Sequence, residues 1–150
     1  MKKTDLAYFA GLFDGEGSIS LCAYKPKGRC IRTTYGLYIS LAQTNEWIIQ
    51  QLKFAFGGNI QPYQPKYPGA RMVWAWRTQS NNALVFLESI YPYLRLKKPQ
   101  ADVAIKFQKH KLLRGGASRS QAYVDFEKEL KDAISRLNKK RVRDGNSSRI

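Results

Sequence analysis

The stretch LAYFAGLFDGEGSIS, residues 6–20, runs from an apolar, helix-like segment through two acids set between glycines into an alternating segment. Residues 5–13 are predicted to form a helix, with Thr4 or Asp5 as its N-cap. Gly11 inside this helix costs about 1 kcal/mol relative to alanine. The absence of a side chain at Gly11 must therefore serve the packing of this helix.

Two stripes run along the predicted helix. One is bulky and suits the core of the domain: Leu6, Phe9 and Phe13. The other has almost no side-chain bulk and repeats at helical spacing: Ala7, Ala10, Gly11 and Asp14. A stripe of small residues lets another backbone approach closely. The alternative is that Gly11 only makes room for a neighbouring core side chain.

The acids at the end of the helix predict a cation site. Gly15 and Gly17 are able to take positive φ and to end the helix tightly. Glu16 then lies just beyond the helix C-terminus, where the last carbonyls are unpaired and the helix dipole is negative. A carboxylate there is unfavourable unless a cation binds, and carboxylate and carbonyl oxygens are ligands that Mg²⁺ accepts.

Beyond this stretch the pattern predicts an α+β domain in the order helix, hairpin, helix, hairpin, helices. The first expected hairpin runs from Ser18 to Leu41 around the turn KPKGR, and a helix EWIIQQLKFAF follows, capped by Thr44 or Asn45 and stopped by Gly57-Gly58. The second hairpin consists of NIQPYQPKY and ARMVWAWRT around Pro68-Gly69. Three helices are expected after it: SNNALVFLESIYPYL, a helix from Pro99 to about Leu113, and an amphipathic helix through Leu137. Alternation then gives a four-stranded antiparallel sheet with helices on one face and an open polar face. We expect one domain over residues 1–138 and a basic tail over residues 139–150.

The charge indicates a polyanionic partner. The 150 residues carry 26 Lys and Arg against 11 Asp and Glu, a net charge of +15. Such an excess favours nucleic acid. No apolar run is long enough for a transmembrane span, so no membrane partner is expected, and the protein is predicted to be intracellular, in a prokaryotic cytoplasm or an organelle. The sequence has no nucleophilic Ser or Cys arrangement and no nucleotide-binding glycine loop. A small-molecule substrate is therefore not expected.

Three further side chains, of two cysteines and one histidine, are considered as metal-binding or reactive groups. Cys22 and Cys30 lack metal-ligand spacing and are expected to stay reduced, with a hairpin disulfide as the alternative. His110 lies among lysines and is predicted to be a surface residue.

The open face supplies the candidate nucleic-acid contacts. Alternation places these residues on it: Ser20, Cys22, Tyr24, Arg32, Thr34, Tyr38, Ser40, Asn59, Gln61, Tyr63, Arg71 and Arg77. Lys25, Lys27 and Arg29, near the first turn, are expected to meet phosphates or flanking bases. Trp74 and Trp76 are assigned to the core. A two-stranded ribbon fits the major groove of DNA, where base edges are distinguishable. The alternative is an ordinary solvated sheet face.

The segment FAGLFDGEG, residues 9–17, resembles the signature of the LAGLIDADG homing endonucleases, with Phe9, Gly15 and Glu16 at positions where leucine, alanine and aspartate are usual. The element order agrees, as do SLAQTNEW and YPYLRLKKPQA. The resemblance implies that Glu16 binds metal with help from the Gly15 carbonyl and that Asp14 is structural.

The same resemblance assigns two further catalytic residues. It implies that Gln43 positions water and that Lys97 stabilises charge at the scissile phosphate, with Lys98 as the alternative if the register differs by one. A basic residue that some members carry just after the position of Gln43 has no counterpart here.

In single-motif members the motif helix packs against its copy in a twofold dimer, which would bring together Ala7, Ala10, Gly11 and Asp14 of two chains. The expected function is a homodimeric, intron-encoded endonuclease that cuts both strands of a long, near-palindromic DNA target with Mg²⁺ or Mn²⁺, while Ca²⁺ binds without supporting cleavage. One alternative is a non-cleaving protein of the same fold, an intron RNA maturase or a transcriptional regulator. Another is a general RNA-binding or ribosome-associated basic protein.

Overall fold

A computed structural model describes residues 1–25, 28, 32–115 and 117–146, with side chains through residue 139. The elements in chain order are α1 (Lys3–Glu16), β1 (Gly17–Tyr24), β2 (Thr34–Gln43), α2 (Glu46–Phe56), β3 (Asn59–Tyr63), β4 (Val73–Gln79), α3 (Ser80–Ile90), the 3₁₀ turn η1 (Tyr91–Tyr93), α4 (Lys98–Arg114) and α5 (Gln121–Asn146). The predicted α+β order is confirmed. Helix α5 includes residues 139–146, the first part of the predicted tail.

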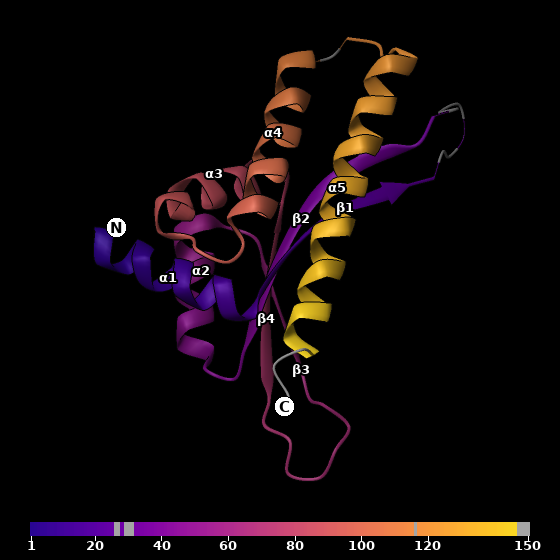
Figure 1. Cartoon of the computed structure of the whole chain (residues 1–150). Helices are drawn as coiled ribbons and strands as arrows, with labels where there is room; N and C mark the ends of the chain where they lie inside the picture. Colours follow the sequence, from indigo (N-terminus) through magenta and orange to yellow (C-terminus); the bar gives the residue numbers. More distant parts are fainter. Residues whose placement is uncertain (26–27, 29–31, 116, 147–150) are drawn as a thin grey trace.

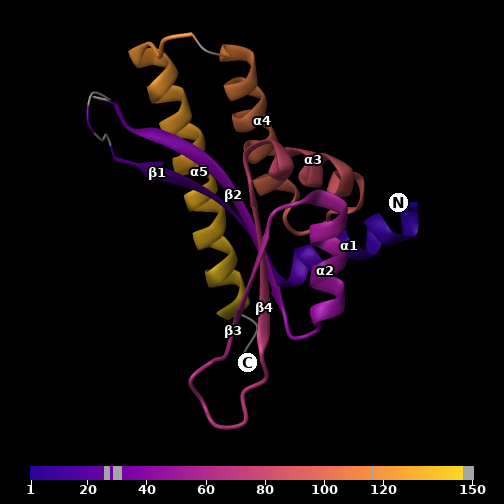
Figure 2. The same ribbon diagram turned by 180° about the vertical axis from the view of Figure 1, so that it is seen from behind.

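The four strands form one antiparallel sheet in the order β1-β2-β4-β3. Its buried face carries Ile19, Leu21, Leu37, Ile39, Leu41 and Trp76, as the alternation predicts. Helix α5 packs along this face of the β1–β2 hairpin: α5 lies in front of the hairpin in Figure 1 and behind it in Figure 2. None of the helices in the described part of the chain covers the opposite face.

Aromatic rings fill the centre of the core. Phe86 of α3 makes edge-to-face contacts with Phe13, Phe56 and Trp76, with ring centroids 5.0–5.1 Å apart. The buried indole N–H of Trp76 donates to the Gly57 carbonyl at 2.8 Å. Gly57 ends α2 with a φ of 69°, so the predicted glycine stop is confirmed. Trp76 is fully buried as predicted, whereas Trp74 is only partly buried.

Several predicted boundaries are corrected. Helix α1 begins at Lys3, with Lys2 as its N-cap, and extends to Glu16. Strand β4 begins at Val73, so Arg71 lies in the preceding loop and not on the strand. His110 is not a surface residue. It is partly buried between α4 and α5, with its ring stacked on Tyr123 at 4.5 Å between centroids.

The small-residue stripe on α1 divides into a buried and an exposed part. Ala10 has no exposed surface and Asp14 only 6%, so both are buried within their own protomer, although all four residues of the stripe were predicted to meet a second chain. Ala7 and Gly11 are exposed. A Cβ added at Gly11 would have no neighbour within 4 Å, which contradicts the alternative that Gly11 makes room for a core side chain.

None of the helices in the described ranges combines the length and the apolar character that a bilayer crossing requires. Cys22 is exposed, and Cys30, its partner in the alternative disulfide, lies outside the described residues.

Candidate active site and nucleic-acid face

Asp14 joins the end of α1 to the segment that leads into α4. One carboxylate oxygen accepts a bond from the backbone N–H of Arg95 at 2.7 Å, and the other accepts from the backbone N–H of Lys97 at 2.8 Å. Carboxylate acceptors of backbone N–H groups make strong, charge-assisted bonds. The structure therefore gives Asp14 a structural position, in agreement with the role that the resemblance implied.

Lys97 lies buried against the same helix end. Its Nζ donates to the Asp14 carbonyl at 2.6 Å. A cation is favourable there because the last carbonyls of a helix have no partner within the helix. Lys98 lies elsewhere, with its Nζ 5.0 Å from the centroid of the Tyr91 ring. Of the two lysines, Lys97 is therefore the one that lies at the end of α1.

At the end of α1, Gly17 is needed for space and not for φ. The prediction of positive φ at Gly15 and Gly17 is wrong: the positive-φ glycines of the described chain lie elsewhere, and Gly17 has a φ of −77°. A Cβ at Gly17 would lie 2.1 Å from the Phe13 ring, so a larger residue there would force the ring or the chain to shift.

Glu16 is the last residue of α1 and is exposed. Next to it in the chain, Gly15 and Gly17 line a cavity of about 280 Å³ together with Ser18, Ile19, Lys97, Gln100 and Asn138. In the described part of the chain, no three His, Cys, Asp or Glu side chains gather to hold a metal ion. The oxygen donors at the helix end, the Glu16 carboxylate and the Gly15 carbonyl, suit Mg²⁺, whose remaining positions water and phosphate usually fill.

Gln43 lies in a different cavity. It ends β2, and its Oε1 accepts bonds from the backbone N–H and the hydroxyl of Thr44, at 2.8 and 3.3 Å. It lines the groove between α1 and α2. Within one protomer the structure therefore brings Lys97 to the end of α1 but does not bring Gln43 to the same cavity.

Two polar residues of the Lys97 cavity were missed. Gln100, one turn after Lys97, is buried, and its Oε1 has no hydrogen-bond partner among the described residues. Helical spacing from Lys97 would have identified it. Asn138 of α5 donates to the Ile19 carbonyl at 3.1 Å, and nothing in the sequence indicated that contact.

The open sheet face carries most of the predicted nucleic-acid residues in one array. The pairing aligns Ser20 with Tyr38, Tyr24 with Thr34, and Ser40 with Arg77, which faces Asn59. By the alternation of these strands, Cys22, Gln61 and Tyr63 lie on the same face. Ser18 and Gln79 also belong to it, and alternation could have identified both.

Arg77 is held at the centre of this array. Its Nη1 donates to Gln61 Oε1 at 2.8 Å. The pair lines a hollow of about 490 Å³ with Tyr38, Asn59 and Gln79 among its walls. Toward the hairpin end, the hydroxyls of Tyr24 and Tyr38 are hydrogen-bonded to each other. The face is therefore polar, hollowed and partly ordered by its own side chains.

Arg32 does not belong to this face. Strand β2 begins only at Thr34, and the Arg32 guanidinium donates to the Arg119 carbonyl in the connection between α4 and α5. The prediction that alternation extends to Arg32 is therefore wrong. Lys25 is exposed just after β1, whereas Lys27 and Arg29 lie outside the described residues.

No family model and no curated protein matches the chain. Solved structures do match. The homing endonuclease I-CvuI, in complex with its target in the presence of calcium, aligns with a TM-score of 0.73 and 18% identity over 90% of this chain and 82% of its own. The archaeal intron-encoded homing endonuclease I-Vdi141I, complexed with DNA, aligns with a TM-score of 0.70 and 17% identity over 91% and 86%. The LAGLIDADG homing endonuclease I-GzeII, in complex with its DNA target, gives a TM-score of 0.66 and 13% identity.

The chain has the LAGLIDADG homing endonuclease fold. The fold expected from residues 9–17 and from the element order is thereby confirmed. The chain covers 43% of the I-GzeII chain, against 82% and 86% of the I-CvuI and I-Vdi141I chains. One copy of this LAGLIDADG fold thus corresponds to about half of I-GzeII.

Proposed function

We propose that the protein is a homodimeric, divalent-metal-dependent DNA endonuclease of the intron-encoded LAGLIDADG type, which makes a double-strand break in a long, near-palindromic target. The observation that carries the proposal is that the two acids at the end of α1, Asp14 and Glu16, lie in different environments. Backbone N–H groups engage Asp14, while Glu16 is exposed and stands in the chain between Gly15 and Gly17, which line the cavity of Lys97. The DNA complexes of proteins with the same fold support it.

Glu16 and the Gly15 carbonyl would hold Mg²⁺ or Mn²⁺, and Ca²⁺ is expected to bind without supporting cleavage. Such an ion supplies Lewis-acid chemistry for phosphodiester hydrolysis when it is bound. Lys97, fixed against the Asp14 carbonyl, supplies positive charge beside the scissile phosphate. Gln43 stays a prediction from the resemblance, since it lies in the other groove.

Two chains are needed because one chain brings one Glu16. Two copies related by a twofold axis would place one such carboxylate on each DNA strand, and the symmetry would favour a palindromic target. The exposed Ala7 and Gly11 allow the two α1 helices to approach closely. The length of I-GzeII, about twice that covered by this chain, agrees with an assembly of two copies.

The open face would read the target. Arginine recognises guanine through two hydrogen bonds in the major groove. Arg77 lies on the open face, where its Nη1 donates to Gln61 Oε1. Lys25 at the end of β1 is placed for phosphate contact, which adds affinity without sequence preference. The net charge of +15 favours this binding.

The test uses the purified protein, Mg²⁺ and DNA that spans the uninterrupted form of its host gene. We expect double-strand cuts that vanish in chelator and in Glu16→Gln. Binding without cuts would overturn the endonuclease and indicate a non-cleaving nucleic-acid-binding protein. Absence of DNA binding would overturn the whole proposal.

A further inference from the structure

Gln100, near the start of α4, is a buried polar side chain with an unused acceptor. Only 5% of the residue is exposed, and its Oε1 has no hydrogen-bond partner among the described residues. Buried polar atoms nearly always have a partner, and an exception in a native protein points to a water molecule, an ion or a catalytic role. Gln100 lines the cavity of about 280 Å³ at the end of α1, together with Lys97.

The local role that such a glutamine usually has is taken by another residue. Lys97 is the N-cap of α4 and Gln100 follows three residues later. At this spacing, the later side chain of a capping box accepts a hydrogen bond from the backbone N–H of the N-cap. In this chain that N–H donates to Asp14 Oδ1 at 2.8 Å. The amide of Gln100 is therefore not engaged in capping the helix and is able to bind a molecule in the cavity.

The cavity suits water better than it suits a metal ion. Its lining residues with polar side chains are Ser18, Lys97, Gln100 and Asn138, and none of the described residues that line it is acidic. The Lys97 cation therefore repels a metal ion without any compensating carboxylate in the wall. A water site needs about 10–15 Å³ and two to four polar partners, and the cavity meets both requirements. Rotation about the last side-chain bond of Gln100 turns either end of the amide toward such a water, because that torsion is broad.

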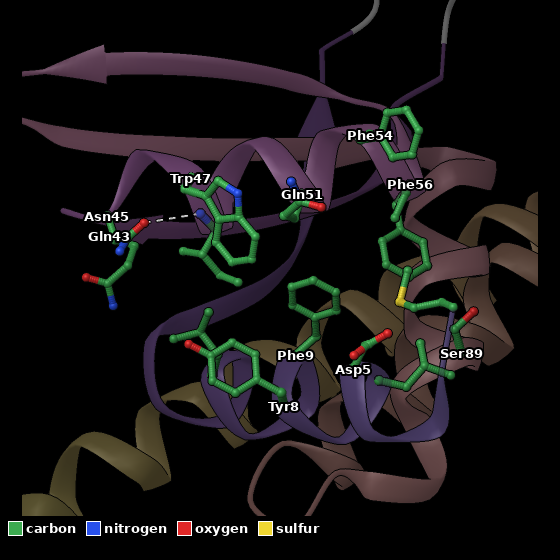
Figure 3. A pocket seen from close by; sticks show the side chains of 15 residues that line it. Asp5, Tyr8, Phe9, Gln43, Asn45, Trp47, Gln51, Phe54, Phe56 and Ser89 are labelled. Carbon is green, nitrogen blue, oxygen red and sulfur yellow. Dashed lines mark hydrogen bonds between the residues drawn. The ribbon is translucent and has the colours of Figure 1, made fainter.

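Gln43, which the resemblance assigned to the placement of water, lies elsewhere in the protomer. Figure 3 shows it in the α1–α2 groove, and its Oε1 accepts from the backbone N–H of Thr44 at 2.8 Å. Gln100 lies instead in the cavity of Lys97, together with the two glycines that flank Glu16 in the chain. Within one protomer, Gln100 is therefore the glutamine that adjoins the end of α1.

We propose that Gln100 is a positioning residue for hydrolysis: its amide oxygen accepts a hydrogen bond from a water in the cavity of Lys97 and turns that water toward the scissile phosphate. The proposed function, on which this inference rests, places the phosphate beside Lys97. In the reaction the water oxygen bonds to phosphorus, the bond from phosphorus to the 3′-oxygen breaks, and the proton that the water loses reaches the 3′-oxygen through solvent. Gln100 takes no proton, because a neutral amide holds the water without acting as a base.

Two substitutions separate positioning from packing. Gln100→Met keeps the volume of the side chain and removes its polar group, whereas Gln100→Glu keeps an acceptor oxygen and adds a charge. We expect single-turnover cleavage by the saturated Mg²⁺ complex to fall about a hundredfold in Gln100→Met, the scale of a misplaced reactant. Gln100→Glu should stay within about tenfold of the wild type, because it still orients the water. A packing role predicts the reverse order, and that order, or equal rates, would overturn the proposal.

Gln108→Met is the matched control on the same helix. Gln108 is 4% exposed and its Oε1 also lacks a partner among the described residues, but Gln108 is not among the residues that line the cavity. Its Nε2 donates to Asn81 Oδ1 at 2.9 Å. We expect the folded Gln108→Met enzyme to cut at the wild-type rate. DNA affinity measured in Ca²⁺ should be the same in all variants, and a Gln100→Met defect confined to affinity would overturn the proposal.

The water itself is measurable without metal or DNA. Nuclear Overhauser spectra of the ¹⁵N-labelled protein should show a cross-peak between the Gln100 side-chain amide protons and a long-lived water. The loss of the amide signal in Gln100→Met or in Gln100→Glu assigns it. Absence of the cross-peak from the wild-type protein would overturn the proposal, even where one of the variants fails to fold.

Failure of the positioning role and failure of the endonuclease give different results. A wild-type chain that cuts DNA, with Gln100→Met equally active, would refute the positioning role and leave the endonuclease intact. A wild-type chain that never cuts DNA would refute the endonuclease and with it the role in hydrolysis, while the cross-peak would still show the water site at Gln100.

Discussion

Replacing Asp14 by asparagine separates the two acids at the end of α1. In the wild type, the carboxylate accepts the backbone N–H groups of Arg95 and Lys97. Asparagine keeps one acceptor and turns a donor toward the other N–H group. A buried donor left without a partner costs about 1–3 kcal/mol, and the lost charge weakens the bond that remains. We therefore expect Asp14→Asn to lower the free energy of unfolding by about 3 kcal/mol.

Glu16→Gln is the matched control, two residues along the same helix. Glu16 is exposed, and a surface substitution of this kind changes stability by no more than about 0.5 kcal/mol. Urea unfolding at one fixed protein concentration measures both variants, because a dimer's stability depends on concentration. An Asp14→Asn protein within about 0.5 kcal/mol of the wild type would refute the structural role of Asp14.

Three further outcomes follow from the geometry. Gly17→Ala should lower the free energy of unfolding by about 1–3 kcal/mol, because its Cβ would overlap the Phe13 ring. Gly15→Ala is the control and should have no such effect, because a Cβ there meets nothing within 4 Å. Equal stabilities of the two variants in thermal melts would count against this packing. Gly11→Leu should fold normally and sediment as a single chain, since the protomer leaves open space at Gly11; a dimer that persists would show that α1 is not at the interface. Lys25→Ala should reduce the slope of log K for DNA binding against log salt by about 0.9 for one lost phosphate contact, and an unchanged slope would remove Lys25 from the interface.

Local periodicity predicted most of the sheet. Alternation in Ile19, Leu21 and Leu37 assigned their faces correctly, because a strand has only two faces and one of them must be buried. The same reasoning was wrong at Arg32, where the strand had not yet begun. The end of a strand depends on its partner and not on its own pattern.

The helix faces were harder to predict. Ala10 and Gly11 are both small, so the sequence could not separate the one in the core from the one on the surface. The bonds from Asp14 to the backbone of Arg95 and Lys97 join residues more than 80 positions apart, and the groups that donate them carry no side-chain signature. Asn138 was missed for the same reason, since only the packing of α5 along β1 brings it to the cavity.

Mixed dimers test the central claim most directly: that two chains each supply one Glu16 to cut one strand. Differently tagged wild-type and Glu16→Gln chains are purified as the mixed dimer and incubated with Mg²⁺ and a supercoiled plasmid that carries the target. Wild-type dimers should make linear plasmid, Glu16→Gln dimers should leave it supercoiled, and mixed dimers should nick one strand and stop at the open circle. Linear plasmid from the mixed dimers, or from Glu16→Gln dimers, would contradict the account.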